Sequence, residues 1–246
     1  MSIILGLNCY HADTAACLIK NGKLEFAIEE ERINRIKHTS DLPILSIKEC
    51  LRQTNTKENE ITHIAFNTNP KSNLFPKFQF LFKKFNLRNN FISRFKDKIK
   101  LDKILKKEFN FSKKVKFIFV EHHLSHISSA FFASKFENAI GLSIDGSGDF
   151  TSMMVTECKE SEIKIKKKIN FPDSLGIFYH AMTQFLGFKN YGDEYKMMGL
   201  AAYGKPIYYD KILTNLFDKK NEIKLNLDYF NHHKNNFKYI AKEQIE

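Results

Sequence analysis

Two histidines and an aspartate form the pattern in this sequence that is best suited to chemistry. His122 and His126 are four residues apart, in a stretch whose apolar residues recur with helical spacing. Residues at that spacing lie on one face of a helix, so both imidazoles can reach one ion. With Asp145 they make a set suited to Fe(II), Mn(II) or Zn(II). The alternative is a surface or helix-capping pair of histidines that binds no metal, and both interpretations stay open.

The aspartate begins a glycine-containing turn, Asp145-Gly146-Ser147-Gly148-Asp149. Gly146 and Gly148 have no Cβ, so backbone N–H groups there can approach a phosphate or a metal-bound oxyanion. A β-hairpin turn is the plainer interpretation, because Asp-Gly is a common hairpin signal. The two interpretations are compatible.

Three elements must position these residues. The β-branched and aromatic run from Lys116 to Val120 predicts a buried strand, and His123 to Ser134 predicts a helix. A second strand is predicted from Asn138 to Ile144, which places Asp145 at its carboxyl end, where α/β sheets usually carry ligand groups. We therefore expect one strand–helix–strand unit.

The amino-terminal region predicts three strands in an antiparallel meander, over Ile3–Asn8, Thr14–Lys20 and Lys23–Glu29. Asn21-Gly22 is a type I′ hairpin signal between the last two. The loop after the first strand carries His11 close to Asp13. That histidine is either a catalytic acid/base or a solvent-exposed turn residue.

The charged segment Glu29–His38 predicts a strand end that leads into a loop, either presenting cations such as Lys37 to an anionic ligand or simply solvated. A helix from Pro43 to Gln53 and a strand from Ile61 to Asn67 follow. Lys71–Ser112 has no strand periodicity and predicts a helical insertion.

The region after the central unit predicts two more strands, Thr151–Glu157 and Ile163–Ile169, and then two helices. Ser174 is suited to cap the first of these helices, and Leu186-Gly187 to close it. Glu194 and Lys196, in the second, are either site residues or a surface ion pair.

Composition excludes some classes of protein. No run approaches ~18 uninterrupted apolar residues, and no basic region precedes the first strand, so we expect neither a membrane span nor a signal peptide. The four cysteines lack CxxC spacing, which is typical of reduced thiols in a cytoplasmic protein. Much of the net charge of +11 lies between Lys77 and Lys116. That stretch is also rich in Phe, and the whole chain favours Lys, Asn, Ile and Phe. We therefore interpret the basic charge as compositional drift on solvated helix faces and do not expect nucleic-acid binding.

Three motifs together resemble a known family. They are His122-His123-x-x-His126 followed by Asp145-Gly146-x-Gly148, the early segment NCYHADTAACLIKNGKLEFAIEEERINRIKH, and the pair GIFYHAMTQFLGF and EYKMMGLAAYG. In this order they resemble the amino-terminal part of the O-carbamoyltransferases, which include nodulation-factor and antibiotic carbamoyltransferases. The resemblance covers Ile3 to Pro206.

The resemblance implies an α/β fold, an actin-like ATPase (ribonuclease H-like) lobe with a mixed sheet and flanking helices. Residues 1–206 would form this lobe, with the basic helical insertion at about 71–114, and residues 207–246 would begin a following segment. Members of the family are more than twice this length, so the lobe would be incomplete.

The resemblance also implies a reaction and a site. Carbamoyl phosphate and ATP would give a carbamoyl-adenylate, whose carbonyl is attacked by a hydroxyl of a sugar or natural-product acceptor. His122, His126 and Asp145 would bind a divalent metal, for which iron is expected and manganese or zinc are alternatives. His11 would be the catalytic acid/base. Substrate or nucleotide binding would fall to a further group: Lys37, Gly146, Gly148, Glu194 and Lys196.

Two other functions stay open at this point. One is a non-catalytic remnant, or a split subunit that needs a second chain for the carboxyl-terminal domains. The other is a relative in tRNA threonylcarbamoyl modification, which the basic segment could serve.

Overall fold

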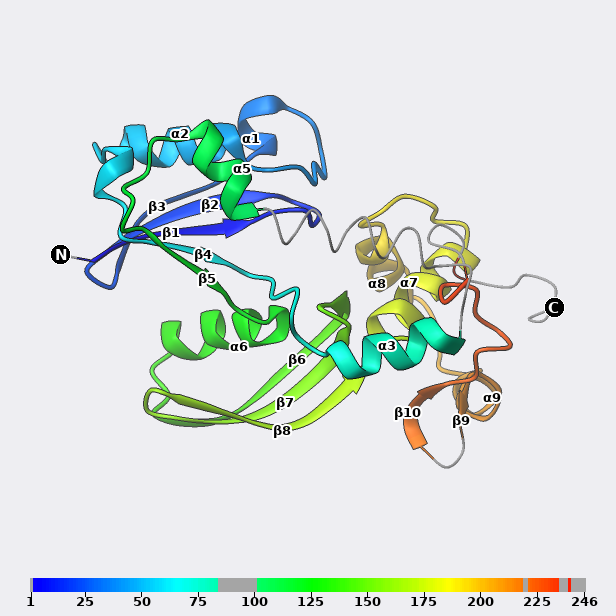
Figure 1. Cartoon of the computed structure of the whole chain (residues 1–246). Helices are drawn as coiled ribbons and strands as arrows, with labels where there is room; N and C mark the ends of the chain where they lie inside the picture. Colours follow the sequence, from blue (N-terminus) through cyan, green and yellow to red (C-terminus); the bar gives the residue numbers. More distant parts are fainter. Residues whose placement is uncertain (1, 84–100, 219–220, 235–238, 240–246) are drawn as a thin grey trace. The chain divides into compact units, whose positions relative to one another are not determined.

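The computed structural model describes residues 2–83, 101–218, 221–234 and 239, and the chain divides into two compact units. The first unit contains residues 1–72 and 90–125, and the second contains residues 73–89 and 126–246. Figure 1 labels their helices and strands. Among the described residues, no helix is long and apolar enough to cross a membrane.

The first unit is built on a five-stranded mixed sheet with the order β3-β2-β1-β4-β5. β1 (Ile3–Asn8), β2 (Ala15–Lys20) and β3 (Lys23–Glu29) form the predicted antiparallel meander. β4 (His63–Phe66) lies parallel to β1, and β5 (Lys116–Phe119) lies parallel to β4. This mixed sheet and its flanking helices confirm the predicted actin-like, ribonuclease H-like fold class.

Helices cover one face of this sheet, as Figure 1 shows. They are α1 (Glu31–Asn34), α2 (Ile44–Gln53) and α5 (Leu101–Glu108), with a 3₁₀ turn, η1, at Glu58–Glu60. Every second residue of β1 is buried, which points one face of the sheet at α2. The fully buried side chains of this core include Leu5, Leu18, Ile47, Ile64, Leu101 and Leu105. Each contributes about 1.5–3 kcal/mol to the free energy of unfolding.

The charged segment after β3 differs from its prediction as a plain loop. It contains the short helix α1, and Glu30 before that helix is buried. The Glu30 carboxylate accepts hydrogen bonds from the backbone N–H groups of Leu45 (3.0 Å) and Ser46 (2.7 Å). A carboxylate at the amino-terminal end of α2 is favourable because the N–H groups there have no helical partners.

The second unit contains a three-stranded antiparallel sheet, β6-β7-β8. Its strands are β6 (Asn138–Gly148), β7 (Thr151–Lys159) and β8 (Glu162–Asn170), and α6 (His122–Ala133) lies over one face (Figure 1). A Cβ on Gly141 would lie 2.7 Å from the Ile127 side chain and 2.4 Å from that of Thr156. The glycine therefore lets α6 approach β6 closely.

The expected strand–helix–strand unit is wrong in one respect. β5 and β6 precede and follow α6 as predicted, but they belong to different sheets. β5 is also an edge strand with Ile118 exposed, not the buried strand predicted from its composition. An apolar run alone cannot distinguish a central strand from an edge strand.

The remaining elements surround α7 (Leu175–Phe185). They are α8 (Glu194–Ala201), α9 (Tyr209–Leu216), β9 (Phe217–Asp218) and β10 (Asn221–Leu225). Ser174 caps α7 as predicted, since its Oγ accepts a hydrogen bond from the Ile177 N–H at 3.0 Å. Ala181 of α7 and Phe230 lie in one buried apolar cluster that also includes Leu216, Phe217 and Leu225. The predicted domain boundary at residue 206 stays a prediction.

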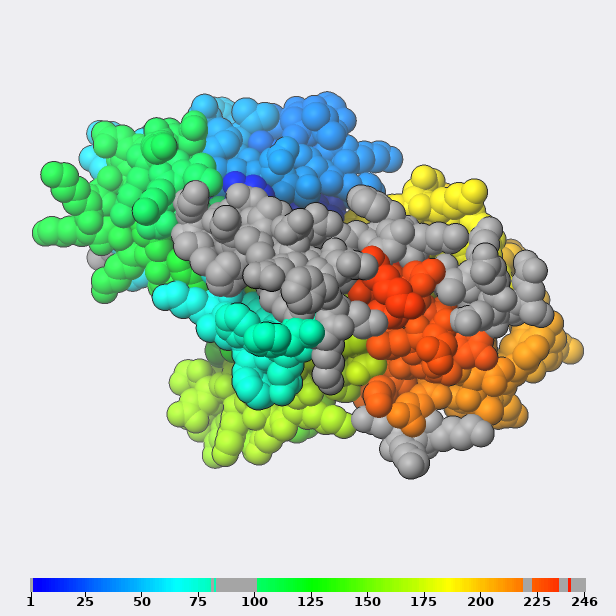
Figure 2. Space-filling view, turned by 45° about the vertical axis from the view of Figure 1, so that its right-hand side comes forward, coloured from blue at the N-terminus to red at the C-terminus, as the bar shows by residue number. Residues whose placement is uncertain are grey.

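The helical prediction for residues 71–112 is confirmed by α3 (Leu74–Lys83) and α5, while residues 84–100 of that segment lie outside the described residues. α3 belongs to the second unit, and Figure 2 shows it against the surface of β7 and β8. Its Phe80 ring makes edge contacts with Phe150 and Phe171, with centroid distances of 5.7 and 5.2 Å. Phe80 of this basic segment thus packs against phenylalanines of the second unit.

Candidate functional site

Asp145 lies inside β6, not at its carboxyl end as predicted. The strand continues to Gly148, and its register with β7 shifts between Ile144 and Gly148. The hairpin turn falls at Asp149-Phe150, where both residues have left-handed backbone angles, φ 49° and 76°. The predicted glycine turn is therefore an irregular strand segment followed by a hairpin. Such bulge-like irregularities re-aim a side chain that a regular strand would point elsewhere.

Two hydrogen bonds hold the backbone and carboxylate of Asp145. Its Oδ1 accepts from the N–H of Gly146 at 2.6 Å, and its carbonyl oxygen accepts from Ser174 Oγ at 2.9 Å. A Cβ on Gly176 would lie 2.5 Å from the Asp145 carbonyl carbon. The first turn of α7 is thus packed directly on Asp145, and the glycine makes that possible.

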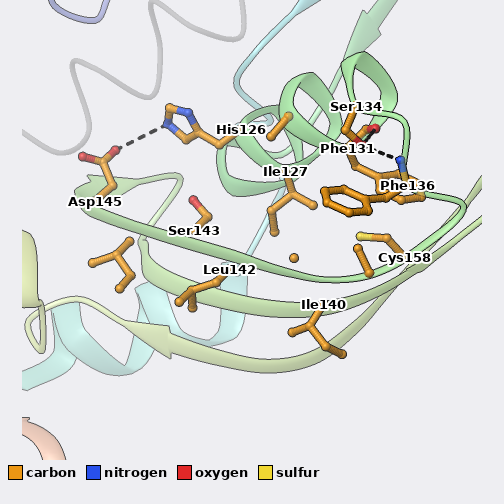
Figure 3. A pocket seen from close by; sticks show the side chains of 14 residues that line it. His126, Ile127, Phe131, Ser134, Phe136, Ile140, Leu142, Ser143, Asp145 and Cys158 are labelled. Atoms are coloured by element: carbon orange, nitrogen blue, oxygen red, sulfur yellow. Dashed lines mark hydrogen bonds and ion pairs between the residues drawn. The ribbon is translucent and has the colours of Figure 1, made fainter.

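His126 faces Asp145 from α6, as Figure 3 shows. Its Nε2 lies 3.8 Å from Asp145 Oδ2, and both side chains are partly exposed. Two ligand atoms each ~2.1 Å from one ion can be at most ~4.2 Å apart, so this separation fits a shared cation.

His122 is one turn before His126 on the same helix, so helix geometry alone puts both rings on one face. His122 belongs to the first unit, whereas His126 and Asp145 both belong to the second. The donor set, two imidazole nitrogens and one carboxylate oxygen, is that of a transition-metal site.

The orientation of His122 is set by the backbone. Its Nδ1 donates a hydrogen bond to the Asn67 carbonyl oxygen at 3.2 Å, because a carbonyl can only accept. The ring proton is therefore on Nδ1, which leaves the Nε2 lone pair as the one that can bind a cation. Metal-binding histidines commonly have such a partner on the other nitrogen. The adjacent His123 is fully buried and contacts His122 edge to face, at a centroid distance of 5.7 Å.

His11 lies against the same histidine. The rings of His11 and His122 are stacked, with centroids 4.9 Å apart and planes 24° from parallel. Both residues belong to the first unit. The structure therefore brings the predicted acid/base residue to the first predicted ligand, although 110 intervening positions separate them in the sequence.

The other predicted binding residues lie in several places. Lys37 is exposed in the turn after α1, and Gly148 is buried opposite Thr151. A Cβ on Gly146 would meet nothing within 4 Å, so packing does not require that glycine.

Glu194 and Lys196 do not form the surface pair that was one interpretation. The Glu194 carboxylate contacts Nδ1 of His180 on α7, and Lys196 Nζ lies 2.7 Å from Asp193 Oδ1. Lys196 lowers the pKa of Asp193. Sequence reasoning missed His180, although its motif, GIFYHAMTQFLGF, was among those that carry the resemblance.

A pocket of ≈620 Å³ extends from His126 and Asp145 between α6 and β6 (Figure 3). Its lining is mainly apolar and includes Ile127, Phe131 and Leu142. A pocket that has polar groups at one end and apolar side chains along the rest of its walls is typical of small-molecule sites.

The model of the carbamoyltransferase N-terminus family matches residues 3–246 of this chain. The chain belongs to that family. The nodulation protein NolNO of Sinorhizobium fredii is 35% identical over 218 residues, which cover 86% of this chain and 30% of NolNO. The Synechocystis protein sll1178 is 36% identical over 246 residues, covering 94% of this chain and 40% of that protein. The family member thus spans about a third of the length of these curated relatives.

Solved structures resemble the chain more distantly. YeaZ from Pseudomonas aeruginosa aligns over 70% of this chain and 68% of its own, with 10% identity and a TM-score of 0.38. A Ppx/GppA family member from Aquifex aeolicus aligns over 83% of this chain and 63% of its own, with 16% identity and a TM-score of 0.38.

Proposed function

We propose that this family member is the amino-terminal part of an O-carbamoyltransferase that transfers a carbamoyl group to a hydroxyl of a sugar or natural-product acceptor. The observation that supports this most directly is the stacking of His11 on His122, the residue that begins the helix carrying His126 toward Asp145. An acid/base group beside a cation-binding set is suited to acyl transfer.

A divalent cation, which we propose to be iron with manganese or zinc as alternatives, would be held by His122, His126 and Asp145. The fit rests on the donor set and on the Nδ1 hydrogen bond of His122. When bound, the ion would supply positive charge that binds phosphate oxygens and polarises a carbonyl.

The chain's own residues would act on the acceptor. Carbamoyl phosphate, water and ATP first give a carbamoyl-adenylate, and phosphate and pyrophosphate leave. The acceptor oxygen then forms a bond to the carbamoyl carbon, the bond from that carbon to the adenylate oxygen breaks, and AMP leaves. A ring nitrogen of His11 would take the hydroxyl proton as the new bond forms. The apolar pocket beside His126 and Asp145 would exclude water that competes with the acceptor.

The adenylation step is proposed to need polypeptide that residues 1–246 do not contain, because the curated relatives are much longer. The test therefore supplies the carboxyl-terminal two-thirds of NolNO together with this chain, Fe²⁺, ATP, [¹⁴C]carbamoyl phosphate and a panel of sugars. We expect label in the sugar fraction only when both polypeptides are present. His11→Asn should reduce the rate by 100-fold or more, since general acid–base catalysis typically contributes 10²–10⁴-fold.

His63→Asn is the matched control, because His63 lies on β4 and its ring, within the part of the chain that the structure describes, bonds the neighbouring Thr62 Oγ1 at 2.9 Å. It should leave the transfer rate unchanged. If intact NolNO labels the sugars but the folded chain with the added NolNO part does not, the proposed activity is wrong, and the non-catalytic alternative is supported.

A further inference from the structure

The loop that carries His11 contains two non-glycine residues in an unfavourable backbone conformation. Tyr10 and Asp13 both have left-handed angles, with φ 53° and 60°. Residues other than glycine adopt this region at a cost and keep it where the surroundings impose it. The contacts that hold the loop therefore determine where the His11 ring lies.

Asn8, the last residue of β1, makes such contacts with the loop. Its Nδ2 donates to the carbonyl oxygens of Ala12 (3.2 Å) and Asp13 (2.9 Å). Its Oδ1 accepts from Asn67 Nδ2 at 2.9 Å. Both amide hydrogens and the amide oxygen are used, so an asparagine fits this position by its hydrogen-bonding groups as well as its shape.

The same pair of asparagines reaches His122. The side chain of Asn67 bonds Asn8, and the backbone carbonyl of Asn67 accepts from His122 Nδ1 at 3.2 Å. Asn67 also continues the pairing of β4 with β1, since its N–H donates a hydrogen bond to the Leu7 carbonyl at 3.4 Å. One residue at the end of β4 therefore connects the loop of His11 to the ring of His122, and all of these residues lie in the first unit.

We propose that Asn8, acting through Asn67, is a positioning residue that sets the His11 ring against His122 and holds His122 in its Nδ1–H form. The roles of His11 and His122 rest on the proposed function, whereas the arrangement of the two rings does not. An aspartate at position 8 has the same shape but lacks both donors and would repel the two loop carbonyls. Asn8→Asp should therefore disrupt the arrangement.

The test uses the whole 246-residue chain and two readouts that require no transfer activity. The first is the ¹H–¹⁵N NMR spectrum of the histidine rings, assigned with His11→Ala and His122→Ala. In Asn8→Asp, we expect the His122 ring signals to move as they do in His11→Ala, because the stacked ring is displaced. In the double variant Asn8→Asp/His11→Ala, they should move little beyond the His11→Ala position.

The second readout is Co²⁺ affinity, followed by the visible spectrum of the bound ion. We expect Asn8→Asp to weaken it about tenfold, the lower end of the effect of losing a partner of a ligating histidine. Asn67→Ala is the second variant, to be used if Asn8→Asp does not fold. It removes the Asn8–Asn67 bond but keeps the Asn8 bonds to the loop, and it should move the same His122 ring signals.

Asn226→Ala is the matched control, because Asn226 also bridges backbone groups, to Asn215 O (3.0 Å) and Asp228 N (3.3 Å), but in the second unit. It should change neither readout. Unchanged His11 and His122 signals and unchanged Co²⁺ affinity in folded Asn8→Asp would overturn the inference. Failure of the carbamoyl-transfer assay with intact ring signals would instead count against the proposed function alone.

Discussion

His126 is the residue on which the proposed metal site can be tested most directly. It is the exposed member of the pair of histidines, and its Nε2 lies 3.8 Å from Asp145 Oδ2. His126→Ala removes a ligand without leaving a buried gap. We expect the variant to lose stoichiometric iron, measured by elemental analysis after anaerobic reconstitution, with its thermal midpoint in the apo form unchanged.

A second His/Asp/Glu group provides the control for that experiment. Ligand atoms of Asp13, Glu31 and His38 lie within 4.8 Å of one another. His38→Ala should leave the iron content unchanged. Iron that persists in His126→Ala and disappears in His38→Ala would show that the ligand assignment is wrong.

A substitution at Gly176 tests the proposed metal site without changing any of its ligands. Any Cβ there would lie within 2.6 Å of backbone atoms of Asp145 and Gly146. Gly176→Ala should therefore push Asp145 away from His126 and weaken Co²⁺ binding by tenfold or more. Gly199→Ala, also within a helix but with nothing within 4 Å of the added Cβ, should keep the wild-type affinity. Equal affinities in the two variants would contradict the proposed role of this contact.

At the scale of elements, much could be predicted because local patterns determine it. The meander β1–β3 follows from alternation and the Asn21-Gly22 turn, and α7 follows from Ser174 and its helical spacing. What could not be predicted depends on contacts distant in the sequence. The Asn8–Asn67 bond joins residues 59 apart, and the sheet to which each strand belongs is not a local property.

In the candidate site, too, some features follow from local sequence patterns and others depend on distant contacts. The spacing of His122 and His126 is a helical signal, so their common face was predictable. The pairing of His180 with Glu194 spans two helices, and no periodicity in either helix indicates it. Asp145 was predicted as a site residue because it lies near a strand end. Its orientation depends on the irregular pairing of β6 with β7 between Ile144 and Gly148, which the local sequence pattern does not determine.

The segment after β10 makes the second unit sensitive to acid. His232 is buried, its Nε2–H donates to the Pro172 carbonyl at 2.9 Å, and burial lowers its pKa to about 4. In the unfolded chain the pKa is ~6.5, so between these values the unfolded state binds a proton that the folded state does not. The free energy of unfolding should thus decrease as the pH falls from 6.5 to 4, by about 3 kcal/mol.

Urea unfolding of the wild type and His232→Phe across this pH range measures that contribution. Phenylalanine keeps the ring contacts with Phe171 and Phe230 but cannot titrate. Asp173, whose pKa is raised by burial, is present in both proteins, so the difference isolates His232. Parallel pH profiles for the two proteins would contradict this account.

At the scale of the whole molecule, the family member combines a five-stranded sheet in one unit with a three-stranded sheet in the other. The two edges of the smaller sheet differ in chemistry. β8 carries lysines at 164, 166, 167 and 168, whereas β6 exposes Ile140 (71%), Leu142 (59%) and Ile144 (48%). Among the described residues, β6 pairs only with β7.

The apolar edge strand β6 should make residues 1–246 prone to associate at high concentration. Lysines on an edge strand discourage aggregation, and an apolar edge invites it. The net charge of +11 opposes association at long range, but salt screens it within about 8 Å at physiological ionic strength. We therefore expect light scattering to rise with salt, and Leu142→Lys to suppress the rise. Leu213→Lys, on exposed α9, should not, and equal suppression by both would mean that charge alone controls solubility.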